Sequence, residues 1–386
     1  MRRRARPARA VLALLVLTPG LNAAAIAARV PMPLAEQVLT SVAQRPGEFR
    51  HVAYPTLLRT GPDEVWLAFK SGRSSVPDAG SAIEIVRHTL STGETRQLQH
   101  IAAPSPKLYQ MGELVRLPDG VVMLAVDVLA IGWDSRHYRT GAEVFRWDPA
   151  RGAFGPPAVQ APVGGILYGY PLEFLSEGEV TWQLVNAFGY NQPSGRWSFD
   201  VLRSGDAGRS WSFVRDLAAE FGGLRVNEGG FARHGDGFLV ATRGFDRVAR
   251  LQRTNADFRL LRQVDLTGRH PLIHDVVARP RIWVRDGRGY LLGRNSTRPP
   301  FEEGAGRWVQ PPQQLCLLRF DPESLAVEDV VVLDNAENAR VNDGYYAVAT
   351  YSGEGAAERL HVFTYRGLEG RPAEIVRLDF RWADVR

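Results

Sequence analysis

The sequence predicts an all-β protein, a six-bladed β-propeller with four-stranded antiparallel blades. Three observations lead to this prediction. The apolar runs are short and are broken by Gly, Pro, Asp and Asn, which is typical of strands and turns. A turn-like pair followed by a strongly apolar run recurs six times, with the glycines 59, 58, 59, 50 and 66 residues apart. These runs are apolar on both faces, as expected of central strands buried between stacked blades.

Each unit supplies at least one recognisable strand, and most supply two. The run after each turn-like pair predicts the second strand of a blade, and a later run in four of the units predicts the third strand. Two β-sandwich domains are the alternative, but no Pro- or Ser-rich linker divides the chain. The predicted second strands are residues 65–69, 121–126, 180–185, 238–240, 290–292 and 360–363. The predicted third strands are residues 83–86, 142–145, 199–202 and 373–376.

Residues 1–27 have the pattern of a secretory signal, which leaves residues 28–386 as a single propeller domain. Five arginines precede the apolar run 10–17, which is too short to span a membrane, and small residues then offer a cleavage site. An uncut membrane anchor is the alternative. We therefore expect export to the periplasm or the medium, with no membrane association after cleavage.

The signal also explains the charge of the chain. The formal net charge is +5, and residues 1–27 contain five arginines and no acidic residue, so residues 28–386 are neutral overall. This removes the support for a nucleic-acid-binding protein. Lys70 and Lys107 are the only lysines, so nearly every cation is an arginine, whose planar fork suits carboxylates.

Neither a disulfide nor a bound cofactor is expected. Cys316 is the only cysteine and lies in an apolar run, so we interpret it as a small core residue. His51, His234 and His274 lack the spacing of metal ligands, and no phosphate-binding loop or Gly-x-Ser-x-Gly motif is found. We expect a monomer with neither a metal nor a cofactor.

Residues 226–244 read as a hairpin with a charged residue at each open end. The strands 230–233 and 238–242 flank a turn at His234–Gly237. Closing this hairpin brings Glu228 and Arg243 together, although a purely structural hairpin needs neither charge. The pair is therefore a candidate for a functional site.

A second short motif, for which we expect a structural role, spans Ser204–Trp211 with the sequence SGDAGRSW. It resembles the Asp-box, or BNR repeat, of the sialidase (neuraminidase) superfamily, a group of β-propellers. Asp accepts backbone N–H bonds in a tight turn, Gly adopts a backbone angle that other residues avoid, and Trp packs the turn on the blade. The matching residues are Ser204, Asp206, Gly208, Ser210 and Trp211.

The resemblance to sialidases also implies a site on the central axis. Glu228 and Arg243 are similar in type, order and separation to a catalytic pair of that family, and Tyr345 in Gly344–Tyr345 resembles its nucleophile. Asp78 lies in a loop after the second strand of the first blade, and it resembles the residue that protonates the leaving oxygen in that family. The expected substrate-binding arginines are Arg243 and Arg279, with Arg281 and Arg294 as alternatives to Arg279, and Arg73.

The chemistry implied by the resemblance is hydrolysis of a terminal acidic sugar similar to sialic acid. A sialic acid carries its carboxylate on the anomeric carbon, which would repel an anionic nucleophile. A neutral Tyr phenol, deprotonated by a nearby Glu, avoids this repulsion. Arginines bind the substrate carboxylate through paired, charge-assisted hydrogen bonds.

The chain departs from the sialidase pattern at its first blade, where Ala53 stands in place of a substrate-binding arginine. Arg50, His51 or Arg73 are the candidates to compensate. Two other functions therefore stay open. The chain also resembles Asp-box propellers that are lyases for uronate polymers such as ulvan, and this resemblance implies that His51 and His274 lie close to Tyr168 or Tyr170. A non-catalytic propeller that binds glycan or protein would have apolar side chains filling its centre.

Overall fold

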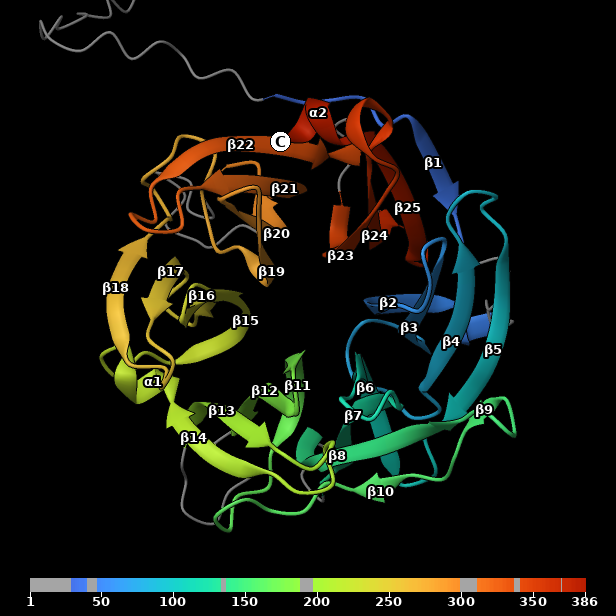
Figure 1. Ribbon diagram of the computed structural model, residues 1–386. Helices are drawn as coiled ribbons and strands as arrows, with labels where there is room; N and C mark the ends of the chain where they lie inside the picture. The colour runs from blue at the N-terminus through green and yellow to red at the C-terminus, as the bar shows by residue number, and fades with distance from the viewer. Residues whose placement is uncertain are drawn as a thin grey trace, which may run out of the picture.

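The computed structural model describes residues 29–39, 47–132, 137–187, 197–298, 311–336, 341–368 and 370–386. In these ranges the strands form six antiparallel sheets arranged in a ring (Figure 1). The predicted six-bladed β-propeller is therefore confirmed. The predicted signal, residues 1–27, lies outside the described ranges and stays a prediction.

Each blade is one sheet, with its first strand nearest the central axis and its last strand at the outer rim (Figure 1). Blades 1 to 3 contain β2 (His51–Arg59), β3 (Glu64–Gly72), β4 (Ala82–Thr89), β5 (Thr95–Ala102); β6 (Lys107–Arg116), β7 (Val122–Ile131), β8 (His137–Asp148), β9 (Ala153–Phe154), β10 (Ala158–Val159); and β11 (Gly169–Glu177), β12 (Val180–Ala187), β13 (Ser198–Ser204), β14 (Ser212–Asp216). Blades 4 to 6 contain β15 (Val226–His234), β16 (Gly237–Gly244), β17 (Ala249–Thr254), β18 (Leu260–Asp265); β19 (Ala278–Arg285), β20 (Arg288–Ser296), β21 (Gln313–Phe320), β22 (Val327–Asp334); and β23 (Val341–Ser352), β24 (Arg359–Leu368), β25 (Glu374–Arg381), β1 (Ala35–Val38).

The apolar runs lie in the strands to which the sequence assigns them. All six predicted second strands fall in β3, β7, β12, β16, β20 and β24, and the four predicted third strands fall in β4, β8, β13 and β25. These strands are apolar on both faces because each blade is covered on both sides by a neighbour.

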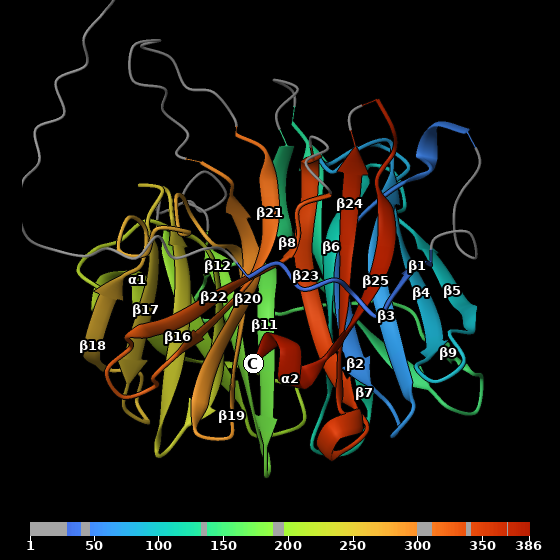
Figure 2. The same ribbon diagram turned by 90° about the horizontal axis from the view of Figure 1, so that it is seen from above.

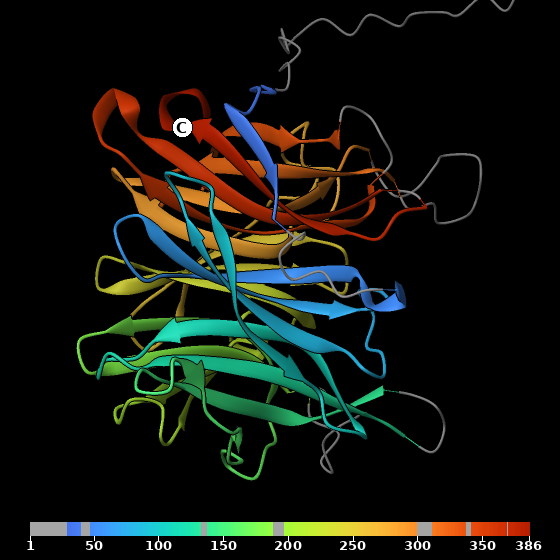
Figure 3. The ribbon, with the colours of Figure 1, turned by 90° about the vertical axis from the view of Figure 1, so that its right-hand side faces the viewer.

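Blade 6 is completed by the N-terminal strand of the described chain. β1 pairs antiparallel with β25, with Ala35 opposite Asp379 and Val38 opposite Val376. The sheet order is β1-β25-β24-β23, so both ends of the chain contribute to one blade (Figures 1 and 3). This pairing closes the ring.

Apolar clusters fill the spaces between neighbouring blades and form the core. Cys316 lies in the cluster between blades 4 and 5, where burial raises the pKa of its thiol to about 12, so the prediction of a core cysteine is confirmed. The described helices are all too short to cross a membrane. They are η2 (Gly47–Phe49), α1 (Leu217–Glu220), η5 (Gly355–Ala357) and α2 (Trp382–Val385).

The first strand of every blade begins at the same end of the ring, and the second strand, which is antiparallel to it, ends there (Figure 2). We call this end the site face. Glu228 lies near the start of β15, and Arg243 lies near the end of β16. The fold therefore places both charges of the hairpin on the site face.

Candidate functional site

The first strands share an irregularity near the site face. In each of the six, the pairing register with the second strand shifts close to the first residues of the strand. Tyr54, Tyr170, Arg279 and Tyr345 adopt left-handed backbone angles at these shifts, with φ of 60°, 57°, 46° and 63°. Such angles cost about 1–3 kcal/mol each and are concentrated at functional sites. A bulge also changes the direction in which a side chain points.

The carboxylate of Glu228 lies where four blades meet. Its Oε1 accepts hydrogen bonds from the hydroxyls of Tyr346, at 2.5 Å, and Tyr170, at 3.0 Å. Its Oε2 accepts bonds from Arg243 Nη1, at 2.9 Å, and from the backbone N–H of Arg279, at 2.8 Å. Only 1% of Glu228 is exposed, so these four donors replace the water that a buried carboxylate has lost.

The local sequence explains how this carboxylate reaches the centre. Glu228 is opposite Arg243 in the β15–β16 ladder, so the hairpin itself pairs the two charges. Gly229 and Gly230 follow, and a Cβ at these positions would lie 2.4 Å from the Phe199 ring and from the Pro280 carbonyl oxygen, respectively. The two glycines therefore let the neighbouring blades approach the strand closely.

The electrostatic setting keeps Glu228 charged and its tyrosine partner neutral. Burial by itself raises the pKa of Glu228, but Arg243, the Tyr346 hydroxyl, the Arg279 N–H group and Arg294 together lower it to about 2. Burial raises the pKa of Tyr346, and the charge of Glu228 raises it further against the effect of Arg294 and Arg243. A charged carboxylate therefore accepts a hydrogen bond from a neutral phenol.

Two arginines lie beside this phenol. Arg243 Nη1 donates to the Tyr346 oxygen at 3.1 Å, and the Arg294 guanidinium carbon lies 4.7 Å from the centre of the Tyr346 ring. Both arginines also line a pocket of about 220 Å³, in which Asp275 pairs with Arg247. This pocket offers an anion access to Arg243 and Arg294.

The expected contact between Tyr345 and Glu228 is corrected by the structure, because Tyr346 occupies that place. Tyr345 is fully buried in the apolar cluster between blades 5 and 6. Burial raises the pKa of its hydroxyl, and the charges that act on it are Asp334 and Arg366, not Glu228. Adjacent strand residues point to opposite sides, so an error of one residue places the phenol in the wrong environment.

Arg279 and Arg281 are also placed differently from the expectation that they bind substrate. Their Nη2 atoms lie 2.7 and 2.8 Å from Oε2 of Glu113, and Arg281 Nη1 lies 3.4 Å from Glu173 Oε1. We call these four residues the axial ion cluster. Only 4% and 9% of the two arginine side chains are exposed, so their charges neutralise buried carboxylates. The backbone N–H of Arg279 nevertheless donates a hydrogen bond to Glu228 Oε2.

We call Glu228, Tyr170, Tyr346, Arg243 and Arg294 the central cluster. Asp78 and Arg73 lie outside it. Asp78 Oδ2 accepts from Lys70 Nζ at 2.8 Å and packs against Gly72, where a Cβ would lie 2.5 Å from that oxygen. Arg73 forms an ion pair with Glu48 at 2.8 Å on the exposed rim. The catalytic role of Asp78 and the substrate-binding role of Arg73 stay predictions.

Tyr54, next to the Ala53 that replaces an arginine, contributes an aromatic ring to the centre. Ala53 itself is fully buried. The Tyr54 ring lies 5.4 Å from that of Tyr346, and its hydroxyl donates to the Ser75 carbonyl oxygen at 2.9 Å. None of the three residues offered as compensation, Arg50, His51 and Arg73, has a described contact with Glu228 or Tyr346.

Sequence reasoning missed Tyr54, the contact of Tyr170 with Glu228, Tyr346, and the two carboxylates of the axial ion cluster. One signal was available for the first two. In blades 1, 3 and 5, a proline near the start of the first strand is preceded by Tyr54, Tyr170 and Arg279, respectively. Each of these three residues has a left-handed backbone conformation. A repeated x-Pro at the blade spacing therefore marks the residues turned toward the axis. For Tyr346, which lacks the proline, no comparable signal exists.

The residues of the Asp-box-like segment form a tight turn at the end of blade 3 opposite the site face. Asp206 Oδ1 accepts from the backbone N–H groups of Arg209 and Ser210, at 3.0 and 2.9 Å, and Gly208 has a φ of +68°. Trp211 packs on Phe174 with ring centres 5.9 Å apart. These contacts agree with a structural role and explain why hydrogen bonds lower the pKa of Asp206.

Within the described ranges, no group of three or more His, Cys, Asp or Glu residues is arranged to hold a metal ion.

The axial ion cluster predicts how the free energy of unfolding depends on pH. Burial, with a contribution from Glu113, raises the pKa of Glu173 to about 7, although Arg281 opposes this. In the unfolded chain Glu173 titrates near its ordinary value of 4.5, so the folded state holds the proton more tightly between pH 4.5 and 7. We expect Glu173 to reduce the free energy of unfolding by about 3 kcal/mol as the pH rises through that window.

The measurement is denaturant unfolding of the wild type and of Glu173→Gln at several pH values from 4.5 to 8. Glutamine carries no charge at any of these values, so the difference between the two proteins isolates this contribution from that of other titrating groups. We expect the difference to change with pH and to level off above pH 7. Parallel stability curves would show that folding leaves the pKa of Glu173 unchanged.

Comparison with known proteins shows the fold. No protein-family model and no curated protein sequence matches the chain. Three solved structures are similar: a protein of unknown function from Dyadobacter fermentans (TM-score 0.64, 16% identity), a mutant Trypanosoma rangeli sialidase with trans-sialidase activity (0.57, 11%) and the Penicillium chrysogenum α-L-arabinanase bound to arabinobiose (0.59, 11%). The matches cover 90%, 93% and 92% of this chain and 98%, 60% and 100% of the others. At these identities the likeness establishes a shared sialidase-like propeller fold.

Proposed function

We propose that the chain is a glycoside hydrolase acting on a sugar that carries a carboxylate next to the bond it cleaves, as in sialic acid. The observation that carries the proposal is the bond between the Tyr346 hydroxyl and Glu228, with Arg243 and Arg294 beside the phenol. The fold shared with a sialidase and an arabinanase supports a glycan substrate.

In the proposed reaction, Arg243 and Arg294 bind the substrate carboxylate through charge-assisted hydrogen bonds. The Tyr346 oxygen attacks the anomeric carbon, its proton passes to Glu228, and the bond from that carbon to the leaving oxygen breaks. A neutral phenol suits this substrate, since the substrate carboxylate does not repel it. Proton transfer to Glu228 is expected to accompany the attack, because the phenol becomes strongly acidic once its oxygen bonds to carbon.

An acid must supply the proton that the leaving oxygen takes up, and Asp78 is the proposed donor. Water then attacks the anomeric carbon and gives a proton to the Asp78 carboxylate, while the bond from that carbon to the tyrosine oxygen breaks and Glu228 returns its proton to Tyr346. For this role Asp78 must give up its contact with Lys70 when substrate binds.

The two alternative functions, a uronate lyase and a non-catalytic binding propeller, receive less support from the contacts. His51 Nε2 lies 3.4 Å from Asp343, Tyr168 donates to Asp200 at 2.6 Å, and Tyr170 donates to Glu228. The His–Tyr cluster expected of a lyase is not among these contacts. The side chains of the axial ion cluster are charged, whereas the binding-module hypothesis requires apolar side chains at the centre.

The test is a substrate screen with the purified protein. Fluorogenic glycosides of acidic sugars, including sialosides, are compared with neutral glycosides of the same fluorophore and with uronate polymers. We expect fluorophore release only from acidic glycosides. Release from neutral glycosides alone, or the ultraviolet absorbance of an unsaturated uronate formed from the polymers, would contradict the proposal.

A further inference from the structure

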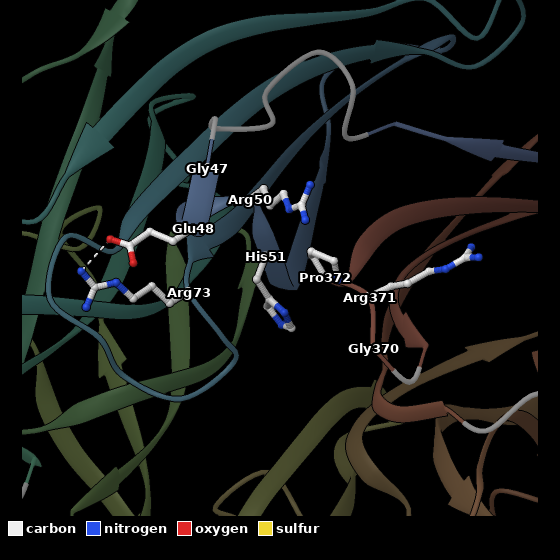
Figure 4. Close-up of a pocket in the computed structure, with 8 residues that line it drawn as sticks. All are labelled: Gly47, Glu48, Arg50, His51, Arg73, Gly370, Arg371 and Pro372. Carbon is white, nitrogen blue, oxygen red and sulfur yellow. Dashed lines mark hydrogen bonds and ion pairs between the residues drawn. The ribbon is translucent and has the colours of Figure 1, made fainter.

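A second cleft opens on the site face between blades 1 and 6, beside the central cluster (Figure 4). Its volume is about 630 Å³. It is formed by η2, the start of β2, the loop after β3 and the turn between β24 and β25. We call it the rim cleft.

Three of the eight residues that line the rim cleft are arginines. Arg50, Arg73 and Arg371 surround it together with His51, and the one carboxylate among its lining residues is Glu48, which pairs with Arg73 (Figure 4). Arg50 and Arg371 are both exposed to solvent. A neighbouring pocket of about 370 Å³ shares these two arginines and is also lined by Arg366 and Glu374.

The backbone keeps the rim cleft open. Gly47 and Gly370 have φ angles of +68° and +75°, and a Cβ built on either would have no atom within 4 Å. A glycine at each position leaves this space without a side chain. The cleft volume of about 630 Å³ is large enough for a sugar ring.

Contacts connect the rim cleft to the candidate site. His51 Nε2 lies 3.4 Å from Asp343 Oδ2, and Asp343 Oδ1 accepts from the Tyr365 hydroxyl at 2.8 Å. The Tyr365 ring lies 6.1 Å from that of Tyr346. One glycan chain leaving the centre over blades 1 and 6 would thus pass over His51 into the cleft.

We propose that the rim cleft is a second anion subsite, which binds the carboxylate or sulfate of another sugar on the same glycan. The substrate class is then an acidic oligosaccharide and not a single acidic sugar on a neutral chain. This inference rests on the proposed function. Arginine forks bind such groups through paired hydrogen bonds, and a concentration of positive charge attracts a polyanion before contact.

The test uses Arg371→Glu in the full chain, with Arg262→Glu as the matched control. Arg262 is exposed on the outermost strand of blade 4, so the control makes the same change of net charge far from the cleft. Values of kcat/KM are measured for an aryl glycoside of one acidic sugar and for a short oligomer of the same sugar. We expect Arg371→Glu to lower the oligomer-to-monomer ratio about tenfold and Arg262→Glu to leave it unchanged.

A binding measurement separates this proposal from the proposed reaction. Titration calorimetry with an oligogalacturonate and with a neutral oligosaccharide of equal length needs no turnover. If the wild type cleaves acidic glycosides and Arg371→Glu has the wild-type ratio, the subsite is disproved and the hydrolase stands. If no glycoside is cleaved but oligogalacturonate binding is lost in Arg371→Glu alone, the subsite stands and the hydrolase fails. Inorganic sulfate binding as tightly as the oligomer would also overturn the subsite.

Discussion

Replacement of Tyr346 by Phe is expected to lower kcat on an acidic glycoside by a factor on the order of 10³ or more, while the protein stays folded. The change removes the oxygen that would attack the sugar and almost no volume. Glu228 keeps three of its four donors, so the loss of stability should be about 2 kcal/mol. The measurements are steady-state kinetics and a thermal melt.

Tyr345→Phe is the matched control, since it removes the same atom from the next residue. Its ring lies in the apolar cluster between blades 5 and 6, and the charges that act on its hydroxyl are Asp334, Arg366 and Glu36, not Glu228, so we expect turnover close to wild type. A fluorinated acidic sugar that forms a slowly hydrolysed adduct should label Tyr346 in the wild type, as judged by peptide mass spectrometry. Loss of turnover in Tyr345→Phe with turnover retained in Tyr346→Phe would reverse the assignment.

Glu113→Gln is expected to produce the largest loss of stability, roughly 3 kcal/mol or more in the free energy of unfolding. Glu113 is 5% exposed and accepts bonds from Arg279, Arg281 and the Thr56 hydroxyl. The amide keeps the shape of the side chain but leaves two buried guanidinium charges without their main counterion. Denaturant unfolding measures the change.

Glu328→Gln provides the comparison, because Glu328 also meets two arginines but on the outer rim. Its Oε2 lies 3.1 and 3.2 Å from Arg319 and Arg288, and 27% of its side chain is exposed. Water screens such a pair, so we expect a loss below about 1 kcal/mol. Equal losses in the two variants would mean that burial adds nothing to the axial ion cluster.

The fold could be predicted from the sequence because its signal is repeated. The turn-like glycine and the apolar run after it occur once per blade, and each run has the composition of a strand buried on both faces. The hairpin that pairs Glu228 with Arg243 was also predictable, since both its strands and its turn are local in sequence. The ladder register places the two residues opposite each other.

The rest of the site could not be predicted because it depends on bulges and on contacts between blades. A register shift between Gly344 and Ala347 decides which of two adjacent tyrosines faces the axis. The sequence does not distinguish the two, because they are the same residue type in the same strand. Arg279 and Arg281 were suitable candidates for binding a carboxylate. They bind the chain's own Glu113, which is more than 160 residues away in sequence.

The pairing of β1 with β25 has a consequence for when the candidate site can exist. Residues 35–38 find their partner only after residues 376–379 have been made, so the ring has one of the longest-range contacts that this chain allows. Contacts between such distant segments are slow to form. Glu228, Tyr170 and Tyr346 come from three blades, and Tyr346 lies in the last one. A growing chain can therefore form the Glu228–Arg243 hairpin early, but it acquires the phenol at its centre only when blade 6 assembles, so a chain without blade 6 lacks the candidate site.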